Sequence, residues 1–174
     1  MKTQISIAIR FSLVSESNSA AFDSGQKMGY EAHKEKILSD ENIEFRLNLF
    51  KKFCLPSLCK MNDSIIKDNP KTQFTVFIVT SSLLSEHSKS EILKTCNAHS
   101  FIQVEFQSES DANIKRPLIR QLKRFKEKTL FVTMRMDDDD AMSDDFYHQL
   151  QPYLTEHFSG YALSFGMGYG MVIS

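Results

Sequence analysis

The sequence predicts an α/β fold, a three-layer α/β/α sandwich built on a mostly parallel sheet. Apolar runs short enough to be strands alternate with segments of helical periodicity, a succession that is typical of parallel α/β sheets. The fourth predicted strand, residues 130–136, stops on the four consecutive aspartates Asp137 to Asp140. Because isolated carboxylates are costly to bury, we expect these acids at the carboxyl end of the strand, where open α/β sheets bind their ligands.

Size and composition indicate a single domain over residues 1–174. Hydrophobic residues make up 41% of the chain and charged residues 25%, and the formal net charge is -1. This balance gives no indication of nucleic-acid binding, which usually needs a basic excess. No apolar run approaches the roughly 20 residues of a membrane span, and the first residues lead into a strand pattern rather than a signal peptide. We therefore expect a cytoplasmic protein whose cysteines (Cys54, Cys59 and Cys96) are reduced.

Strands and helices are predicted in alternation along the chain. The strands are apolar or alternating runs, at residues 5–13, 73–80, 101–106, 130–136 and 161–165. The longer helices follow from apolar residues spaced three or four positions apart, at residues 43–61, 85–97, 111–126 and 143–160. Residues 14–41 are expected to form a flexible loop near the ligand edge, with a short helix at residues 31–38.

Capping residues, prolines and glycines set the expected boundaries. The predicted helix caps are Asn42, Asp111, Ser143, and Ser88 in a capping box with Glu91. Pro56 is expected to kink or split the first long helix, and Pro152 to disturb the last one before Gly160 ends it. The glycines at 166, 168 and 170 open no helix, so they predict a tight hairpin or an edge strand rather than a phosphate loop.

The run Asp137 to Asp140 predicts a site for a divalent cation. Like charges this close repel one another, and hard carboxylate oxygens suit Mg²⁺ or Mn²⁺ held jointly with substrate phosphates. The alternative is a solvated acidic turn that caps the next helix. Arg10, at the end of the first strand, is either an exposed charge or a contact to a nucleotide base or phosphate.

Three segments resemble the rhamnosyltransferase family of bacterial polysaccharide synthesis, a group of GT-A glycosyltransferases with an Asp-x-Asp motif. They are Ile9-Arg10-Phe11-Ser12, residues 49–58 (Leu-Phe-Lys-Lys-Phe-Cys-Leu-Pro-Ser-Leu) and residues 135–141 (Arg-Met-Asp-Asp-Asp-Asp-Ala). The last segment is similar to the family's Arg-Leu-Asp-x-Asp-Asp-Ala-Leu, with methionine at 136 and 142. The resemblance covers essentially the whole chain and implies a GT-A fold.

The resemblance implies transfer of a hexose, such as rhamnose, from a dTDP- or UDP-sugar donor to a glycan acceptor. Metal, held by Asp139 and Asp137, would offset the charge on the departing diphosphate, and Asp140 would orient the site or cap the next helix. The residues implied for nucleotide-sugar binding are Arg10, Ser81, Arg120, Asp137 and Asp138.

The catalytic base is not identified by the sequence. In inverting enzymes of this fold the base follows well after the metal motif. We therefore expect the base beyond residue 174, in a longer enzyme whose donor-binding part is this chain. The alternative is that the chain is a shortened homologue. His148 and His157 are expected to be surface residues. Two other functions remain open: a nucleotide-sugar-binding module without catalysis, and a phosphatase-like hydrolase with Asp137 as nucleophile. The second is disfavoured because such enzymes place their acids after the first strand.

Overall fold

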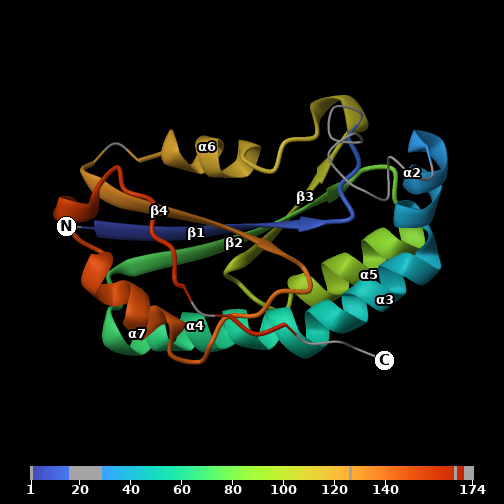
Figure 1. Cartoon of the computed structure of the whole chain (residues 1–174). Coiled ribbons are helices and arrows are strands. Elements are labelled where there is room, and N and C mark those ends of the chain that lie inside the picture. The colour runs from blue at the N-terminus through green and yellow to red at the C-terminus, as the bar shows by residue number, and fades with distance from the viewer. Residues whose placement is uncertain (1, 16–28, 126, 167, 171–174) are drawn as a thin grey trace.

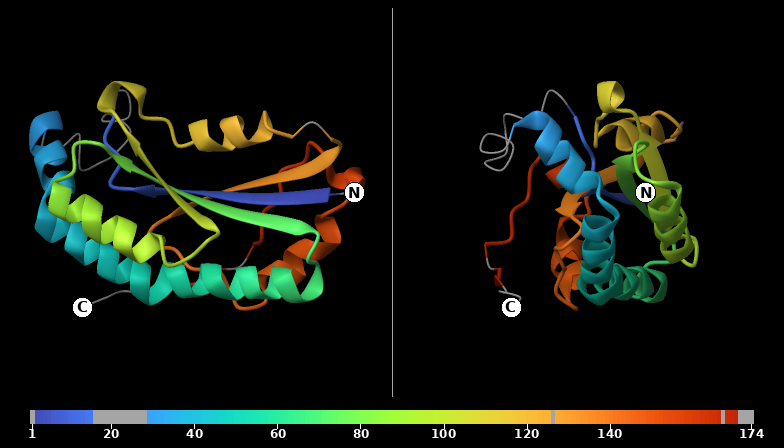
Figure 2. Two further views of the ribbon diagram at one scale, coloured as in Figure 1. Left: turned by 180° about the vertical axis from the view of Figure 1, so that it is seen from behind. Right: turned by 90° about the vertical axis from the view of Figure 1, so that its right-hand side faces the viewer.

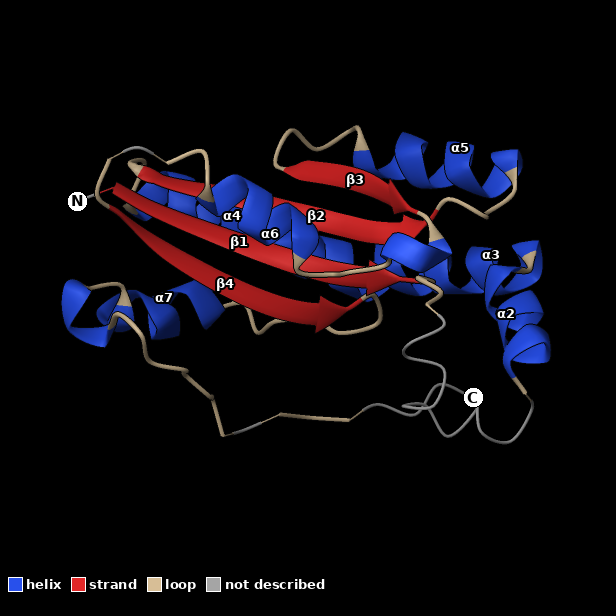
Figure 3. Ribbon diagram, turned by 90° about the horizontal axis from the view of Figure 1, so that it is seen from above, coloured by secondary structure: helices blue, strands red, loops and turns tan. Residues whose placement is uncertain are grey.

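Four strands form one parallel sheet in a computed structural model that describes residues 2–15, 29–125, 127–166 and 168–170. The strands are β1 (Lys2–Phe11), β2 (Thr72–Ser81), β3 (Ile102–Gln107) and β4 (Thr129–Asp137). Their order across the sheet is β3-β2-β1-β4, and every neighbouring pair is parallel (Figures 1 and 3). The first four predicted strands and the parallel sheet are therefore confirmed.

Helices cover both faces of the sheet, which confirms the three-layer α/β fold. The α-helices are α2 (Tyr30–Leu38), α3 (Asp40–Leu49), α4 (Leu55–Asp68), α5 (Glu86–Cys96), α6 (Arg116–Leu122) and α7 (Phe146–Leu150). Helix α6 lies alone on one face, whereas α3, α4, α5 and α7 lie on the other (Figures 1 and 2). A short helix was predicted at residues 31–38, and α2 confirms it; residues 16–28 of the predicted loop lie outside the described residues.

A π-helical turn, η2 (Phe50–Cys54), joins α3 to α4 without a break in the helix. Pro56 stands in the first turn of α4. Proline lacks a backbone N–H, and its ring clashes with the carbonyl four residues earlier, so a wider turn before it relieves the conflict. The predicted disturbance at Pro56 thus takes the form of a π turn rather than a break.

The hydrophobic core lies between the sheet and the helices α3, α4 and α5. Alternate residues of β1 (Ile5, Ile7, Ile9 and Phe11) are buried in it. The ring of Phe11 meets that of Phe50 edge-on, with ring centroids 6.3 Å apart. The π turn is therefore part of the core at the carboxyl end of the sheet.

The opposite face of the sheet carries buried polar side chains beneath α6. Gln4, Ser6 and Thr75 are buried there. Gln121 of α6 accepts a hydrogen bond from Ser6 Oγ at 2.6 Å, and its Nε2 donates to Thr75 Oγ1 at 3.1 Å. Gln4 Nε2 also donates to Thr75 Oγ1, at 3.3 Å. These hydrogen bonds compensate for the burial of polar groups and fix α6 to β1 and β2.

The predicted caps of the two central helices are wrong by three residues. Ser39, not Asn42, caps α3, because Ser39 Oγ accepts the backbone N–H of Asn42 at 3.3 Å. Ser85, not Ser88, caps α5 in the same way, accepting from Ser88 N at 3.1 Å. In both cases the predicted residue is the third one after the true cap, where it supplies the N–H that the cap binds.

Helix α6 is shorter than the predicted helix at residues 111–126, and Asp111 does not cap it. The side chain of Gln107 holds the preceding loop by accepting from Asn113 N at 2.7 Å and donating to Asn113 O at 3.2 Å. The helix begins only at Arg116, with Pro117 in its first turn, where proline is well tolerated. Leu122, at the end of α6, is half exposed.

The chain after β4 departs most from the prediction. Instead of one helix over residues 143–160, α7 is followed by two short 3₁₀ turns, Gln151–Tyr153 and Glu156–Phe158, and Ser143 makes no side-chain cap. Residues 161–165 pair with no strand, although a strand was predicted. Their side chains are exposed. Because no described strand pairs with the outer side of β4, this strand is an edge of the sheet (Figure 3). The described glycines at 166, 168 and 170 form no strand either, and residues 167 and 171–174 lie outside the described residues.

Among the described residues, every helix is too short or too polar to cross a bilayer.

We predict that Phe50→Ala lowers the free energy of unfolding by about 3–5 kcal/mol, because it removes a ring that is only 1% exposed and leaves a cavity against Phe11. The matched control is Phe45→Ala on the same long helix, whose side chain is 57% exposed. We expect the control to change stability by no more than about 0.5 kcal/mol. Urea denaturation followed by circular dichroism measures both, and equal losses would contradict this assignment of the core.

Candidate functional site

The four aspartates form a tight turn at the carboxyl end of β4. Asp137 is the last residue of the strand, and the backbone N–H of Asp140 donates to Asp137 O at 3.2 Å. The backbone N–H of Asp137 in turn donates to Asp140 Oδ2 at 3.1 Å. The side chains of Asp139 and Asp140 are exposed and that of Asp137 is half-buried, whereas Asp138 is completely buried. We call residues 137–140 the acid turn.

Asp138 points away from solvent and is bound by Arg46 of α3. Arg46 Nε donates to Asp138 Oδ2 at 2.8 Å, and Arg46 Nη2 donates to Asp138 Oδ1, so both carboxylate oxygens are used. Such a two-pronged contact is the strongest pairing available to a carboxylate in a protein interior. Asp138 was implied as a nucleotide contact; in this structure it has no accessible surface to offer a ligand.

Burial has the largest influence on the pKa of Asp138. It raises the pKa of Asp138, although the hydrogen bond and the charge of Arg46 act in the opposite direction. Burial also raises the pKa of Cys54 in the neighbouring π turn, and the negative charges of Asp138, Asp140 and Asp139 add to that effect. The thiol of Cys54 is therefore a protonated core group beside the acid turn.

Asp137, the last residue of β4, points to the same side of the sheet as Arg135, because alternate residues of a strand share a face. Arg10 of β1 lies beside it in the sheet register, with Arg10 Nη2 and Asp137 Oδ1 separated by 3.5 Å. Arg135 of β4 approaches the same oxygen at 4.0 Å. Two guanidinium groups and a carboxylate thus meet at the carboxyl edge of the sheet.

Arg120 lies at the far end of the same row of the sheet. The register aligns Asp137 with Arg10, Arg10 with Val79, and Val79 with Glu105 on β3. Arg120 pairs with Glu105, so its partner is three strand spacings, about 14 Å, from Asp137. The structure therefore brings Arg10 to the acids and leaves Arg120 at the opposite end of the carboxyl edge.

Two serines lie between these ends of the row. Ser81 is the last residue of β2 and is buried, and its Oγ accepts the backbone N–H of Leu83 at 3.2 Å. Ser12 follows β1 with a φ of 46°, in the left-handed region that serine rarely adopts. Its buried hydroxyl has no hydrogen-bond partner among the described residues. Strained backbone and unmet hydrogen bonds of this kind cluster at ligand sites.

The acid turn offers two carboxylates to a cation rather than a complete cage. The described part of the chain contains no group of three or more His, Cys, Asp or Glu residues arranged to hold a metal ion. With Asp138 bound to Arg46, Asp137 and Asp139 remain as the predicted ligands. Such a pair suits Mg²⁺, which is usually held by one or two carboxylates together with substrate phosphates and water.

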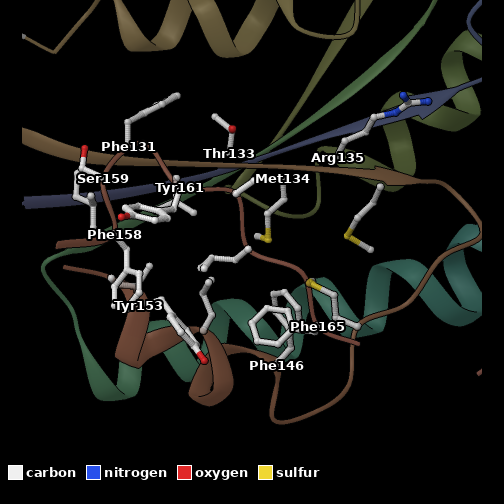
Figure 4. Close-up of a pocket in the computed structure, with 18 of the residues that line it drawn as sticks. Phe131, Thr133, Met134, Arg135, Phe146, Tyr153, Phe158, Ser159, Tyr161 and Phe165 are labelled. Carbon is white, nitrogen blue, oxygen red and sulfur yellow. The ribbon is translucent and has the colours of Figure 1, made fainter. Parts of the chain in front are cut away.

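A cavity of about 950 Å³ opens beside the acid turn, under β4 (Figure 4). Met134 and Met136 line it from the strand, and Asp140 lies at its edge. Its opposite wall consists of the aromatic side chains of Phe146, Tyr153, Phe158, Tyr161 and Phe165. Arg135 points to the other side of β4 from these rings (Figure 4). The cavity therefore combines apolar surfaces with hydroxyl and carboxylate groups next to the predicted metal ligands.

Comparison with known proteins identifies the family. The family model described as "Putative rhamnosyl transferase" matches residues 4–173. The chain belongs to this family. The resemblance inferred from the sequence is thereby confirmed, and the family description implies a sugar donor and an acceptor. Searches of curated proteins and of solved structures each find no match.

Sequence reasoning missed Arg46, Arg135 and Ser12 as members of the site. Arg46 is 92 residues from its partner Asp138, and its position on a helix carries no signal of that pairing. An indication was available only for Arg135 and Ser12, which lie in two of the segments that resemble the family. His148 and His157 do not belong to the site: His148 is exposed, with its Nε2 2.9 Å from Asp68 Oδ2, and His157 is exposed.

We predict that Cys59 reacts with Ellman's reagent faster than Cys54 and Cys96 in the native protein at pH 8, because it is only half-buried, although burial and the charge of Asp63 raise its pKa too. Cys54 and Cys96 are buried, and burial raises the pKa of Cys96 to about 12, so both remain protonated and shielded. In urea all three thiols should react. The Cys59→Ser variant is the control and should lose the fast phase; two or more fast thiols in the native protein would contradict the burial of Cys54 and Cys96.

Proposed function

We propose that this chain binds a nucleoside-diphosphate sugar, a dTDP- or UDP-hexose, and transfers the hexose to a glycan acceptor. The observation that carries the proposal is the acid turn, which presents Asp137 and Asp139 at the carboxyl edge of a parallel sheet in a chain of the rhamnosyl transferase family. This edge is where open α/β sheets bind nucleotides. Rhamnose is the sugar that the family description favours.

The donor would lie along the row of side chains at the carboxyl edge. The distance of about 14 Å between the partner of Arg120 and Asp137 is comparable with the length of an extended nucleoside diphosphate. In this arrangement Arg120 and Ser81 are near the nucleoside, and the diphosphate is near Asp137. Arg10 and Arg135 would each exchange part of their contact with Asp137 for phosphate oxygens, which guanidinium groups bind well.

Asp137 and Asp139 would hold Mg²⁺ or Mn²⁺ jointly with the diphosphate. When bound, the cation offsets the negative charge that builds on the leaving diphosphate as the glycosidic bond breaks. The chain's own arginines act in the same direction, because Arg10 and Arg135 already lie close to that position. Asp140, which accepts from Asp137 N, keeps the turn closed.

The cavity under β4 is our candidate for the acceptor. It adjoins the acid turn through Asp140, and a volume of about 950 Å³ lies in the range of small-molecule sites. The aromatic rings offer apolar surfaces to the C–H faces of a sugar, and the hydroxyl groups of Tyr153, Tyr161 and Ser159 offer hydrogen bonds. Because Arg135 points to the opposite side of β4, a glycan lying there would meet the donor at the acid turn, where Asp140 borders the cavity.

We predict that UDP or dTDP binds this chain in the presence of Mn²⁺ and loses most of its affinity in EDTA. Asp139→Asn should weaken binding by roughly 100-fold or more, since changes behind a metal ligand already cost 10–100-fold. The matched control is Asp144→Asn, an exposed aspartate beyond the turn that pairs with Lys60. Isothermal titration calorimetry measures all three proteins.

Binding that is equal in EDTA would contradict the role of the metal, and no binding of either nucleotide would contradict the donor site. The alternative function, a nucleotide-sugar-binding module without catalysis, is tested by adding UDP- or dTDP-hexose and measuring release of the free nucleotide. Metal-dependent binding without release at high protein concentration would favour the module. Release of phosphate from an aryl phosphate would instead favour the hydrolase.

A further inference from the structure

The ion pair between Arg46 and Asp138 connects the acid turn to the helical layer. Asp138 is completely buried, and its two oxygens receive Nε and Nη2 of the same guanidinium group. It stands between Asp137 and Asp139, the residues to which the proposed function assigns the cation. The only cation that the structure places on Asp138 within the described residues comes from α3, on the opposite face of the sheet from α6.

We propose that Arg46 is a positioning residue, which sets the direction in which Asp137 and Asp139 present their carboxylates. A two-pronged contact fixes the plane of the Asp138 carboxylate as well as its distance, because the guanidinium group is planar and rigid. With Asp138 fixed on one side of the turn, its two neighbours are directed away from that side. The expected effect of Arg46 on nucleotide binding rests on the proposed function, whereas its effect on the orientation of the acid turn does not.

The turn itself is too short to fix its own orientation. Two hydrogen bonds between Asp137 and Asp140, at 3.1 and 3.2 Å, close the loop but do not orient it on the sheet. Arg10 and Arg135 contact Asp137 at 3.5 and 4.0 Å, distances too long for strong hydrogen bonds. The contact with Arg46 is the shorter and more directional one, so it determines how the turn sits.

The helix that carries Arg46 is a rigid support. One turn further on, Phe50 is buried against Phe11 at the end of β1. At the start of the same helix, Asp40 accepts hydrogen bonds from Ser85 Oγ at 2.5 Å and Ser88 Oγ at 2.6 Å, which ties α3 to α5. Arg46 is therefore anchored on both sides, and a group held by packed neighbours positions a site more accurately than a loop can.

Stability alone is a weak explanation for this pair. Removing two charges from water costs about as much as their attraction returns, and well-packed apolar residues often replace a buried ion pair without loss. A double variant can therefore keep the fold while it removes the orienting contact. Arg46→Met combined with Asp138→Leu is such a variant, because it leaves no buried charge without a partner.

The test compares Arg46→Lys, the double variant Arg46→Met/Asp138→Leu and the control Arg124→Met with the wild type. Arg124 is exposed just before the start of β4, at the opposite end of that strand from the acid turn. Hydrogen exchange of the Asp137 and Asp140 amides reports on the turn, urea denaturation on the fold, and calorimetry with Mn²⁺ and UDP or dTDP on the site. Lysine keeps the charge but loses the planar fork, so it separates charge from geometry.

We expect both Arg46 variants to exchange the Asp137 and Asp140 amides at least about 10-fold faster and to bind the nucleotide with Mn²⁺ roughly 10–100-fold more weakly, the range seen when support behind a metal ligand is removed. The double variant should do so with a urea midpoint close to that of the wild type, and Arg124→Met should match the wild type throughout. If Arg46→Lys does not fold, the double variant still decides the question.

Wild-type exchange at these amides in a folded double variant would overturn the proposal, and so would exchange that rises equally across the whole chain. If the wild type binds neither nucleotide, the proposed function fails, but the exchange experiment still decides whether Arg46 positions the turn. If the wild type binds and the double variant binds equally well, the positioning role fails and the proposed function stands.

Discussion

The buried carboxylate of Asp138 is the constraint on which the arrangement of this site depends. A charge with no accessible surface needs a complete set of partners, and Arg46 supplies them from a helix 92 residues earlier in the chain. Asp138 lies in the turn and pairs with the helical layer, whereas Asp137, the last strand residue, pairs with Arg10 and lies near Arg135. Asp138 is therefore buried in its ion pair with Arg46, whereas the carboxylates of Asp137, Asp139 and Asp140 remain accessible.

The two faces of the sheet also have different roles. Its lower face is apolar, with Ile5, Ile7 and Ile9 against the long helix, and packing there fixes the strands. Its upper face is mixed: Gln4, Thr75 and Gln121 form a hydrogen-bonded layer beneath α6, and Phe77 and Val79 are buried on the same face. A parallel sheet is normally apolar on both faces, so the buried hydrogen-bonded layer on this face is unusual. At its carboxyl end this face becomes the row of charged residues to which we assign the donor.

Family membership and geometry support the same function from different directions. The match to the rhamnosyl transferase family covers residues 4–173 and is independent of any structural detail. The geometry contributes a pair of accessible acids, two arginines and an adjoining aromatic cavity, a set that suits a cation, a diphosphate and a sugar. The two carboxylates fall short of a metal cage by themselves, which is the expected arrangement where the substrate completes the coordination.

The sequence by itself determined the four strands, the parallel sheet and the location of the acids, because these follow from periodicity within a few neighbouring residues. The tertiary structure decided what depends on distant partners. It holds the loop before α6 with Gln107, so that helix is shorter than its pattern predicts, and it leaves residues 161–165 unpaired beside β4. It also decided that Asp138, one of four identical residues in the sequence, is the buried one. Its partner Arg46 comes from another layer of the fold, and no local pattern encodes a contact across 92 residues.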